Sequence, residues 1–305
     1  MSAVLGTAEA RLTRALWALE GLSIGDAFGD RFFVDPDVVE ELIAARTVPP
    51  PPWPYTDDTE MALSVVVVLQ RHGGVDQAAL AREFAGRHDP ARGYGPAMHG
   101  LIARLRRGDD WRAAAGALFA GQGSHGNGAA MRVAPLGAYF ADDPEAAAAE
   151  AARSAAVTHA HPEGIAGAVA VAVAAAWAWR LRGTPARPDW RAFLERVAAV
   201  VPAGAVQSRL RRALTLSETT PVQGAVGILG NGTALSAPDT VPFALWCAAR
   251  HLDDYAAALW LTVSGLGDRD TTCAIAGGVV AAHVGAEGIP AAWRAAREPL
   301  PVWAR

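Results

Sequence analysis

The sequence predicts an all-α protein, and three observations support that prediction. Ala, Leu and Arg, which favour helices, are abundant along the chain. Apolar residues recur at steps of three and four, and the segments that connect the periodic stretches are short and polar or rich in Pro and Gly. No shift in composition marks a domain boundary, and no internal repeat is present. Residues 1–305 are therefore predicted to form a single compact domain.

The periodicity predicts the helices in order. In the first half of the chain they span Ala8–Gly21, Asp37–Ala45, Asp58–Arg71, Gln77–Arg87, Pro96–Arg107, Trp111–Phe119 and Ala129–Arg132. In the second half they span Pro144–Val157, His161–Arg182, Trp190–Val200, Gln207–Leu216, Pro242–His251, Asp253–Val263, Thr271–Val284 and Ala291–Arg297. The valines of Ser64–Val68 favour a strand by propensity, but their place in a long periodic segment favours a helix. The apolar run Gly164–Trp179 borders on membrane-span length; its Ala and Val content and the polar residues just before it indicate a core helix.

Three glycine-rich loops are predicted to interrupt this pattern, at Gly25–Gly29, Arg92–Gly95 and Gly121–Gly128. The third leads into the predicted helix at Ala129, whose free backbone N–H groups would suit a phosphate or diphosphate. The alternative for each is an ordinary connecting loop, and for Gly21 and Gly25, which are four residues apart, a further alternative is close helix packing. The run Pro49–Pro54 is predicted to be an extended surface loop that steers the chain toward the site described next.

Two acidic blocks near opposite ends of the chain predict a metal site. Thr56–Thr59 and Asp268–Thr271 each precede a long apolar run that is predicted to be a buried helix. If the fold brings the two helix starts together, their carboxylates and hydroxyls converge, and that much negative charge needs compensation. An all-oxygen ligand set selects hard divalent ions, Mg²⁺ first and Mn²⁺ or Ca²⁺ next. The alternative is that Thr56, Asp57 or Asp270 only caps its helix.

Composition excludes several classes of function. The net charge of −4 and the pI of about 6.1 argue against general nucleic-acid binding or binding to an anionic membrane. All 27 basic residues are Arg, which excludes Schiff-base chemistry and a P-loop lysine. Cys247 and Cys273 lie in apolar runs and are expected to be reduced, buried thiols. Met1–Glu20 has no signal-peptide pattern, so we expect a cytoplasmic protein. We also expect a monomer.

Five segments, taken together and in this order, resemble the ADP-ribosylglycohydrolase family. They are Gly21–Gly29, Thr56–Met61, Gly126–Arg132, Thr158–Gly164 and Gly267–Thr271. The resemblance covers the chain from about Leu16 to Trp293 and implies a compact all-α orthogonal helical bundle with a binuclear magnesium centre in a cleft. It also implies hydrolysis of the glycosidic bond at C1 of the distal ribose, which releases ADP-ribose from an ADP-ribosylated substrate.

The resemblance also assigns roles to particular residues. The implied ligands of the two magnesium ions are Thr56, Asp57, Asp58, Asp268, Asp270 and Thr271. The residues implied to hold the diphosphate and the distal ribose are Gly93, Tyr94, Gly95, Ser124, Gly126, Asn127 and Gly128, with His159 near the same pocket. Asp26 is expected to support the metal site indirectly, and His161 to be a structural residue at a helix start. Arg132 is expected to pair either with a structural carboxylate or with a phosphate.

The sequence departs from the family at the expected acid or base. Phe33 stands where family members often carry a Glu that contacts the metal site. Asp30 or Asp35 could replace that Glu, Asp89 is a further candidate, and otherwise the carboxylates of the metal site suffice, namely Asp57, Asp58 and Asp270. The alternative function is an ADP-ribose-binding module without turnover. The aglycone stays open among arginine, serine, nucleic acid and a small molecule.

Overall fold

The computed structural model describes residues 6–184 and 189–304, and within these residues all regular secondary structure is helical. The α-helices are α1 (Ala8–Asp30), α2 (Pro36–Ala44), α3 (Asp57–His72), α4 (Gln77–Arg87), α5 (Pro96–Arg106), α6 (Trp111–Gly116), α7 (Leu118–Gly121), α8 (Ala134–Tyr139), α9 (Pro144–Ala156), α10 (Pro162–Arg180), α11 (Trp190–Val200), α12 (Ala205–Ala213), α13 (Val222–Leu229), α14 (Ala237–Arg250), α15 (Tyr255–Val263), α16 (Arg269–Val284) and α17 (Ala291–Ala296). Short 3₁₀ turns are η1 (Pro90–Arg92), η2 (Asn127–Ala129), η3 (Ala286–Gly288) and η4 (Val302–Ala304). The all-α prediction is confirmed.

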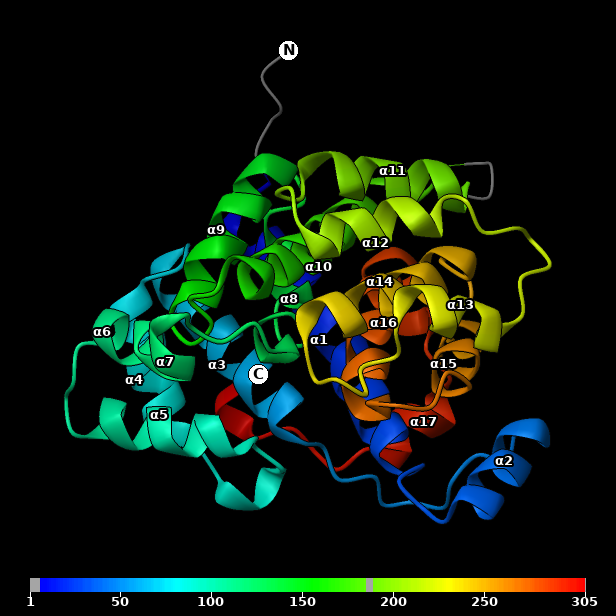
Figure 1. Ribbon diagram of the computed structural model, residues 1–305, viewed down its shortest axis with the longest axis horizontal. Helices are drawn as coiled ribbons and strands as arrows, with labels where there is room; N and C mark the ends of the chain where they lie inside the picture. The colour runs from blue at the N-terminus through cyan, green and yellow to red at the C-terminus, as the bar shows by residue number, and fades with distance from the viewer. Residues whose placement is uncertain (1–5, 185–188, 305) are drawn as a thin grey trace.

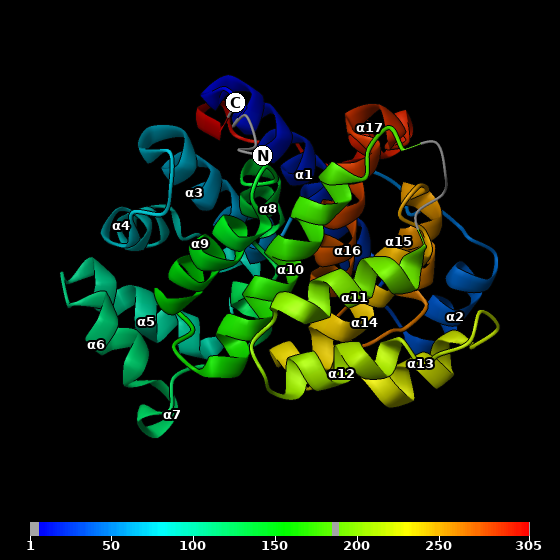
Figure 2. The same cartoon turned by 90° about the horizontal axis from the view of Figure 1, so that it is seen from above.

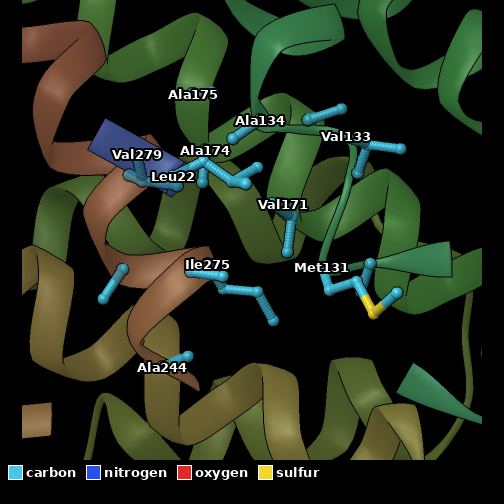
Figure 3. Packing of buried hydrophobic residues seen from close by; sticks show 14 of the residues in the cluster. Leu22, Met131, Val133, Ala134, Val171, Ala174, Ala175, Ala244, Ile275 and Val279 are labelled. Carbon is cyan, nitrogen blue, oxygen red and sulfur yellow. The ribbon is translucent and has the colours of Figure 1, made fainter. Parts of the chain in front are cut away.

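Helices α1, α10 and α16 form the centre of the molecule, and the other helices pack around them (Figures 1 and 2). Figure 3 shows Val171 and Ala174 of α10 beside Ile275 and Val279 of α16, with Leu22 of α1 next to them. Helix α10 is long and apolar enough to cross a membrane, yet 72% of its apolar stretch is buried inside the fold. It packs as the core helix that the sequence indicates.

The contact between α1 and α16 depends on glycines spaced four residues apart on α1. A Cβ atom at Gly25 would lie 2.2 Å from the carbonyl oxygen of Cys273, and one at Gly29 would lie 2.2 Å from that of Arg269. Only glycine allows the two backbones to come this close. The prediction of a loop at Gly25–Gly29 is therefore wrong: α1 continues to Asp30, and its glycines serve helix packing.

Other differences from the sequence-based prediction have local causes. The predicted helix at Ala129 is a single 3₁₀ turn, so no long helix offers its N-terminus to a phosphate there. Helix α14 begins at Ala237 and accommodates Pro242 inside it, whereas Pro242 was expected at its first turn, where proline is favoured. Helices α8 and α13 are short and contain glycine, and the periodicity does not predict them. Ser64–Val68 is helical, within α3, as expected.

The segment after α17 holds the loop that leads into α3. Trp53 is fully buried, and its backbone N–H donates to the carbonyl of Ala296 at 2.7 Å. The N–H of Glu298 donates to the carbonyl of Trp53 at 3.0 Å, and Trp293 stacks on Phe28 of α1 with ring centroids 4.6 Å apart. Most of Pro49–Pro54 lies at the surface as predicted, but the buried indole fixes where the loop enters the site.

Candidate active site

The fold brings the two acidic blocks together at the starts of α3 and α16. The hydroxyl of Thr271 on α16 lies 3.4 Å from Oδ1 of Asp58 on α3. One pocket of about 250 Å³ contains these two side chains and the other carboxylates of both blocks, those of Asp57, Asp268 and Asp270. The convergence that the sequence predicts is therefore present.

Asp26 on α1 fixes the start of α3 from behind. Its buried carboxylate accepts the hydroxyl of Thr56 at 2.8 Å and that of Thr59 at 2.5 Å, as well as both backbone N–H groups. Burial raises the pKa of Asp26 to about 6, although these hydrogen bonds act in the opposite direction. Asp26 does not line the pocket, so its position fits the indirect supporting role that was expected.

Thr56 differs from the other predicted ligands because it caps a helix and faces a different pocket. Thr56 is the N-cap of α3, since its side chain accepts the N–H of Asp58 at 3.3 Å, and it faces an adjoining pocket. Its only free capacity is the remaining lone pair of a hydroxyl that already donates to Asp26. No side chain caps α16, although Asp268 stands at its N-cap position. The carboxylates of Asp57 and Asp270 therefore do not serve as caps.

The carboxylates of the pocket are buried close enough together to repel one another. Burial, and then the charge of Asp26, raise the pKa of Asp57 to about 7. Burial and the neighbouring carboxylates raise the pKa values of Asp58 and Asp270 well above the usual range. Oδ2 of Asp58 and Oδ1 of Asp270 are buried, and neither has a hydrogen-bond partner among the residues that the structure describes. Orphaned anionic oxygens of this kind are what a bound cation would satisfy.

The available oxygen ligands suit a hard divalent ion, although they are not yet arranged around a common centre. Among residues 6–184 and 189–304, no three His, Cys, Asp or Glu side chains already have the arrangement of a metal site. Oδ2 of Asp268 accepts a hydrogen bond from Nδ2 of Asn127 at 2.6 Å. The oxygens best placed to hold Mg²⁺ are those of Asp57, Asp58 and Asp270, with Asp268 and Thr271 beside them.

Residues of the glycine-rich loops also line the pocket. Gly93, Gly95, Ser124, Gly126, Asn127 and Gly128 all line it. The side chain of Tyr94, by contrast, is buried, and its hydroxyl donates to Oε1 of Glu60 at 2.6 Å. Contrary to the prediction, Tyr94 does not line the pocket. The Asn127 amide donates to Asp268 and to Thr240, so this side chain links the loop to the acidic cluster.

The two histidines of the segment Thr158–Gly164 take different places. His159 lines the pocket, and burial together with the charge of Arg132 lowers its pKa to about 3, so the ring is neutral. His161 caps α10 by accepting the N–H of Glu163 at 3.1 Å, as expected for a structural residue. Arg132 is fully buried and donates to main-chain carbonyls and a hydroxyl, so the expectation of a carboxylate or phosphate partner is wrong.

The candidate acids lie outside this pocket. Asp30, at the end of α1, lines the adjoining pocket with Asp89, and Gly93 separates the two pockets by lining both. Burial raises the pKa of Asp30. Phe33 is 51% exposed beside the guanidinium of Arg269 and lines neither pocket. Asp35 caps α2 instead.

An apolar part of the pocket was not predicted. Phe119 and Leu235 line it, and they are 54% and 62% exposed. Both have positive φ angles near 50°, which is uncommon for residues other than glycine and often marks a functional site. Phe119 adjoins the Gly121–Gly128 loop, a signal that could have suggested it. Leu235 is set against this loop only by the fold, through the N–H of Asn127 at 3.2 Å from its carbonyl.

Comparison with known proteins identifies the family of the chain. The ADP-ribosylglycohydrolase family model matches residues 7–304. The chain belongs to the ADP-ribosylglycohydrolase family. It is 29% identical to the human ADP-ribosylhydrolase ARH3, over 93% of this chain and 88% of that protein. The zebrafish (Danio rerio) ADP-ribosylhydrolase ARH3 is 30% identical, over 94% and 87%. A solved structure titled ADP-ribosylglycohydrolase-related protein complex superposes with a TM-score of 0.66 at 27% identity, covering 95% of this chain and 94% of its own.

Proposed function

We propose that the protein is a magnesium-dependent hydrolase that cleaves the glycosidic bond at C1 of the distal ribose and releases ADP-ribose. The observation that supports this most is the meeting of two acidic helix starts with glycine loops in one pocket. Oδ2 of Asp58 and Oδ1 of Asp270 are buried there without partners. Family membership and the similarity to ADP-ribosylhydrolases supply the substrate class.

The two walls of the pocket suit the two ends of ADP-ribose. The loops at Gly93–Gly95 and Ser124–Gly128 let the diphosphate approach the backbone closely, because glycine has no side chain to block it. Phe119 and Leu235 offer an apolar surface to the adenine ring, which can stack on the exposed phenyl ring. This placement sets the distal ribose toward the acidic helix starts.

The reaction adds water across the bond between C1 and the leaving atom. The acidic cluster would bind Mg²⁺, which supplies orientation of the ribose hydroxyls and a more acidic water when it is bound. As the bond breaks, positive charge develops at C1, and the carboxylates of Asp57, Asp58 and Asp270 stabilise it. The water oxygen forms the new bond to C1, one of these carboxylates accepts its proton, and a proton passes to the leaving group. Asp30 and Asp89 line the adjoining pocket on the other side of Gly93, and they are the candidate donors to a leaving group that extends into that pocket.

Hydrolysis assays on arginine-linked and serine-linked ADP-ribosyl peptides test this function. We expect release of ADP-ribose from at least one substrate in Mg²⁺, none in EDTA, and none from Asp270→Asn. An enzyme that turns over equally well in EDTA would contradict the magnesium dependence.

Phe33 supports a second candidate function, an ADP-ribose-binding module without turnover. No carboxylate occupies the position of the family Glu, and the Phe33 side chain is exposed outside both pockets. If the wild type binds ADP-ribose without hydrolysis and Phe33→Glu gains activity, this function replaces the first. Hydrolysis by the wild type decides against it.

A further inference from the structure

A fully buried arginine lies behind the loop that lines the pocket, and it has no acidic partner among the described residues. Arg132 donates to the carbonyl oxygens of Gly128 at 3.2 Å and Ser154 at 3.0 Å, and to the hydroxyl of Thr158 at 2.9 Å. The ring of Phe84 covers it, with the guanidinium carbon 4.5 Å from the ring centroid. Burying a cation without a carboxylate in direct contact is costly, so its presence calls for an explanation beyond packing.

Thr158 transmits the effect of Arg132 to His159. Oγ1 of Thr158 lies 2.7 Å from Nδ1 of His159, and both side chains are buried. The hydroxyl accepts from Arg132 and has one proton to donate, for which Nδ1 is the only acceptor among the described residues. If Nδ1 were protonated, the hydroxyl proton would be buried without an acceptor, which would disfavour that form roughly tenfold or more. Nδ1 therefore accepts, and the ring proton lies on Nε2.

The Nε2 edge of His159 lies against Gly126 and Gly128, and all three residues line the pocket. A Cβ atom at Gly126 would lie 3.3 Å from Nε2, and one at Gly128 would lie 3.2 Å from it, so both glycines make room for the ring. His159 lines the pocket, and Nε2 has no hydrogen-bond partner in the part of the chain that the structure describes. The arrangement leaves one unused N–H donor at the pocket wall.

We propose that Arg132 and Thr158 are positioning residues that fix His159 as a neutral Nε2–H donor to a phosphate or ribose oxygen of the bound ligand. The inference rests on the proposed function, because it takes ADP-ribose as that ligand. A neutral ring needs this help, since it can donate from only one nitrogen at a time. Burial and the Arg132 charge keep the pKa of His159 near 3, so the ring does not gain a second proton instead.

The tautomer can be measured without any ligand. Long-range ¹H–¹⁵N spectra of protein labelled with ¹⁵N-histidine distinguish the two forms, and His159→Gln identifies its signals among the 8 histidines. We expect the Nε2–H form in the wild type, a mixture in Thr158→Val, and recovery of the Nε2–H form in Thr158→Ser. A dominant Nδ1–H form in the wild type would overturn the proposal.

A separate variant tests whether Arg132 helps to fix the tautomer of His159. Arg132→Met keeps much of the side-chain length and removes the N–H group that orients the Thr158 hydroxyl, so the hydroxyl proton is no longer directed at Nδ1 and a mixture of tautomers is expected. An unchanged Nε2–H form in a folded Arg132→Met protein would remove Arg132 from the proposal. Should this variant fail to fold, the pair Thr158→Val and Thr158→Ser still decides whether the hydroxyl fixes the ring.

Binding separates this inference from the proposed function. Thr158→Val should raise the Kd for ADP-ribose about tenfold, the loss of one well-oriented hydrogen bond, whereas Thr158→Ser should bind like the wild type. The thermal shift caused by Mg²⁺ should be the same in all three, because no residue of the acidic cluster changes. Equal ADP-ribose affinity in Thr158→Val and the wild type would overturn the proposal. If the wild type binds no ADP-ribose, the proposed function fails, and the tautomer spectra still test whether Arg132 and Thr158 fix the ring.

Discussion

At the scale of single residues, the acidic cluster destabilises the folded protein when no metal is bound. Asp58 and Asp270 are held by two different helices, and burial together with neighbouring carboxylates raises the pKa of each: Asp26 and Asp270 act on Asp58, and Asp268 and Asp26 act on Asp270. One oxygen of each is buried and unpaired. Such an arrangement destabilises the folded chain unless a cation or protons neutralise it. Stability measurements should therefore reveal the site independently of catalysis.

Asp270→Asn should have opposite effects with and without metal. In EDTA it replaces a buried carboxyl group, which must either repel its neighbours or take up a proton, by a neutral amide of nearly the same volume, so the free energy of unfolding should rise by on the order of 1 kcal/mol. In Mg²⁺ the wild type should gain about 2.7 kcal/mol at a concentration 100 times the Kd, and the variant should gain little. Thermal unfolding in both buffers measures this. An equal magnesium response in both proteins would show that Asp270 is not a ligand.

The raised pKa values predict a specific pH dependence. The pKa is about 6 for Asp26 and about 7 for Asp57 in the folded chain, compared with the usual value of 3.8. Between about pH 4 and 7 the folded state then holds more protons than the unfolded state, so the metal-free protein should lose stability as the pH rises. Asp57→Asn should make this decline shallower.

Magnesium should act in the reverse direction over the same range, because its ligands must be deprotonated. The difference in melting temperature between Mg²⁺ and EDTA should therefore widen from about pH 5 to pH 8. A difference that is constant across this range would argue that the buried carboxylates of the cluster do not bind the ion.

At the scale of elements, the starts of α3 and α16 were predictable and the end of α1 was not. A hydroxyl or acidic residue before a long apolar run is a local signal, so Thr56 and Asp268 mark their helix starts. The glycines between Gly21 and Gly29 locally favour a break, and only the contact with α16 explains why they are helical. Tertiary packing, which one sequence does not show, overrides the local preference there.

Gly25→Ala tests this role for glycine on α1. The new methyl group would meet the Cys273 carbonyl at 2.2 Å, which forces α1 and α16 apart and should cost about 1–3 kcal/mol of stability or more. Gly100→Ala is the matched control, because Gly100 lies within α5 with open space around it and should gain roughly 0.5–1 kcal/mol. Chemical denaturation compares the two. Equal stabilities would mean that α1 does not depend on close approach to α16.

At the scale of the whole molecule, the site is assembled from segments far apart in the chain. The acidic residues of the pocket could be predicted because their residue types carry the chemistry. The directions of the Tyr94 and Asn127 side chains could not, since they depend on Glu60 and Asp268. Leu235 belongs to no recognisable motif. It lines the pocket because the next residue, Ser236, forms a β-bridge with Gly126.

The segment after α17 completes this assembly through Glu298. Its carboxylate accepts the N–H of Tyr55 at 2.8 Å and a guanidinium N–H of Arg92, just before the first acidic block and the Gly93 loop. Glu298→Ala should cost about 1–2 kcal/mol of stability and weaken magnesium and ADP-ribose binding together. Glu195→Ala, at an exposed position of α11, is the control and should change neither. Unaltered binding in Glu298→Ala would limit this residue to a structural role.

Calorimetric titration of ADP-ribose into the purified protein, first with Mg²⁺ and then with EDTA, tests the central claim most directly. We expect saturable binding with magnesium and its loss or strong weakening in EDTA, because the acidic cluster and the glycine loops share one pocket. Absence of binding in both buffers would contradict the assignment of this pocket to ADP-ribose.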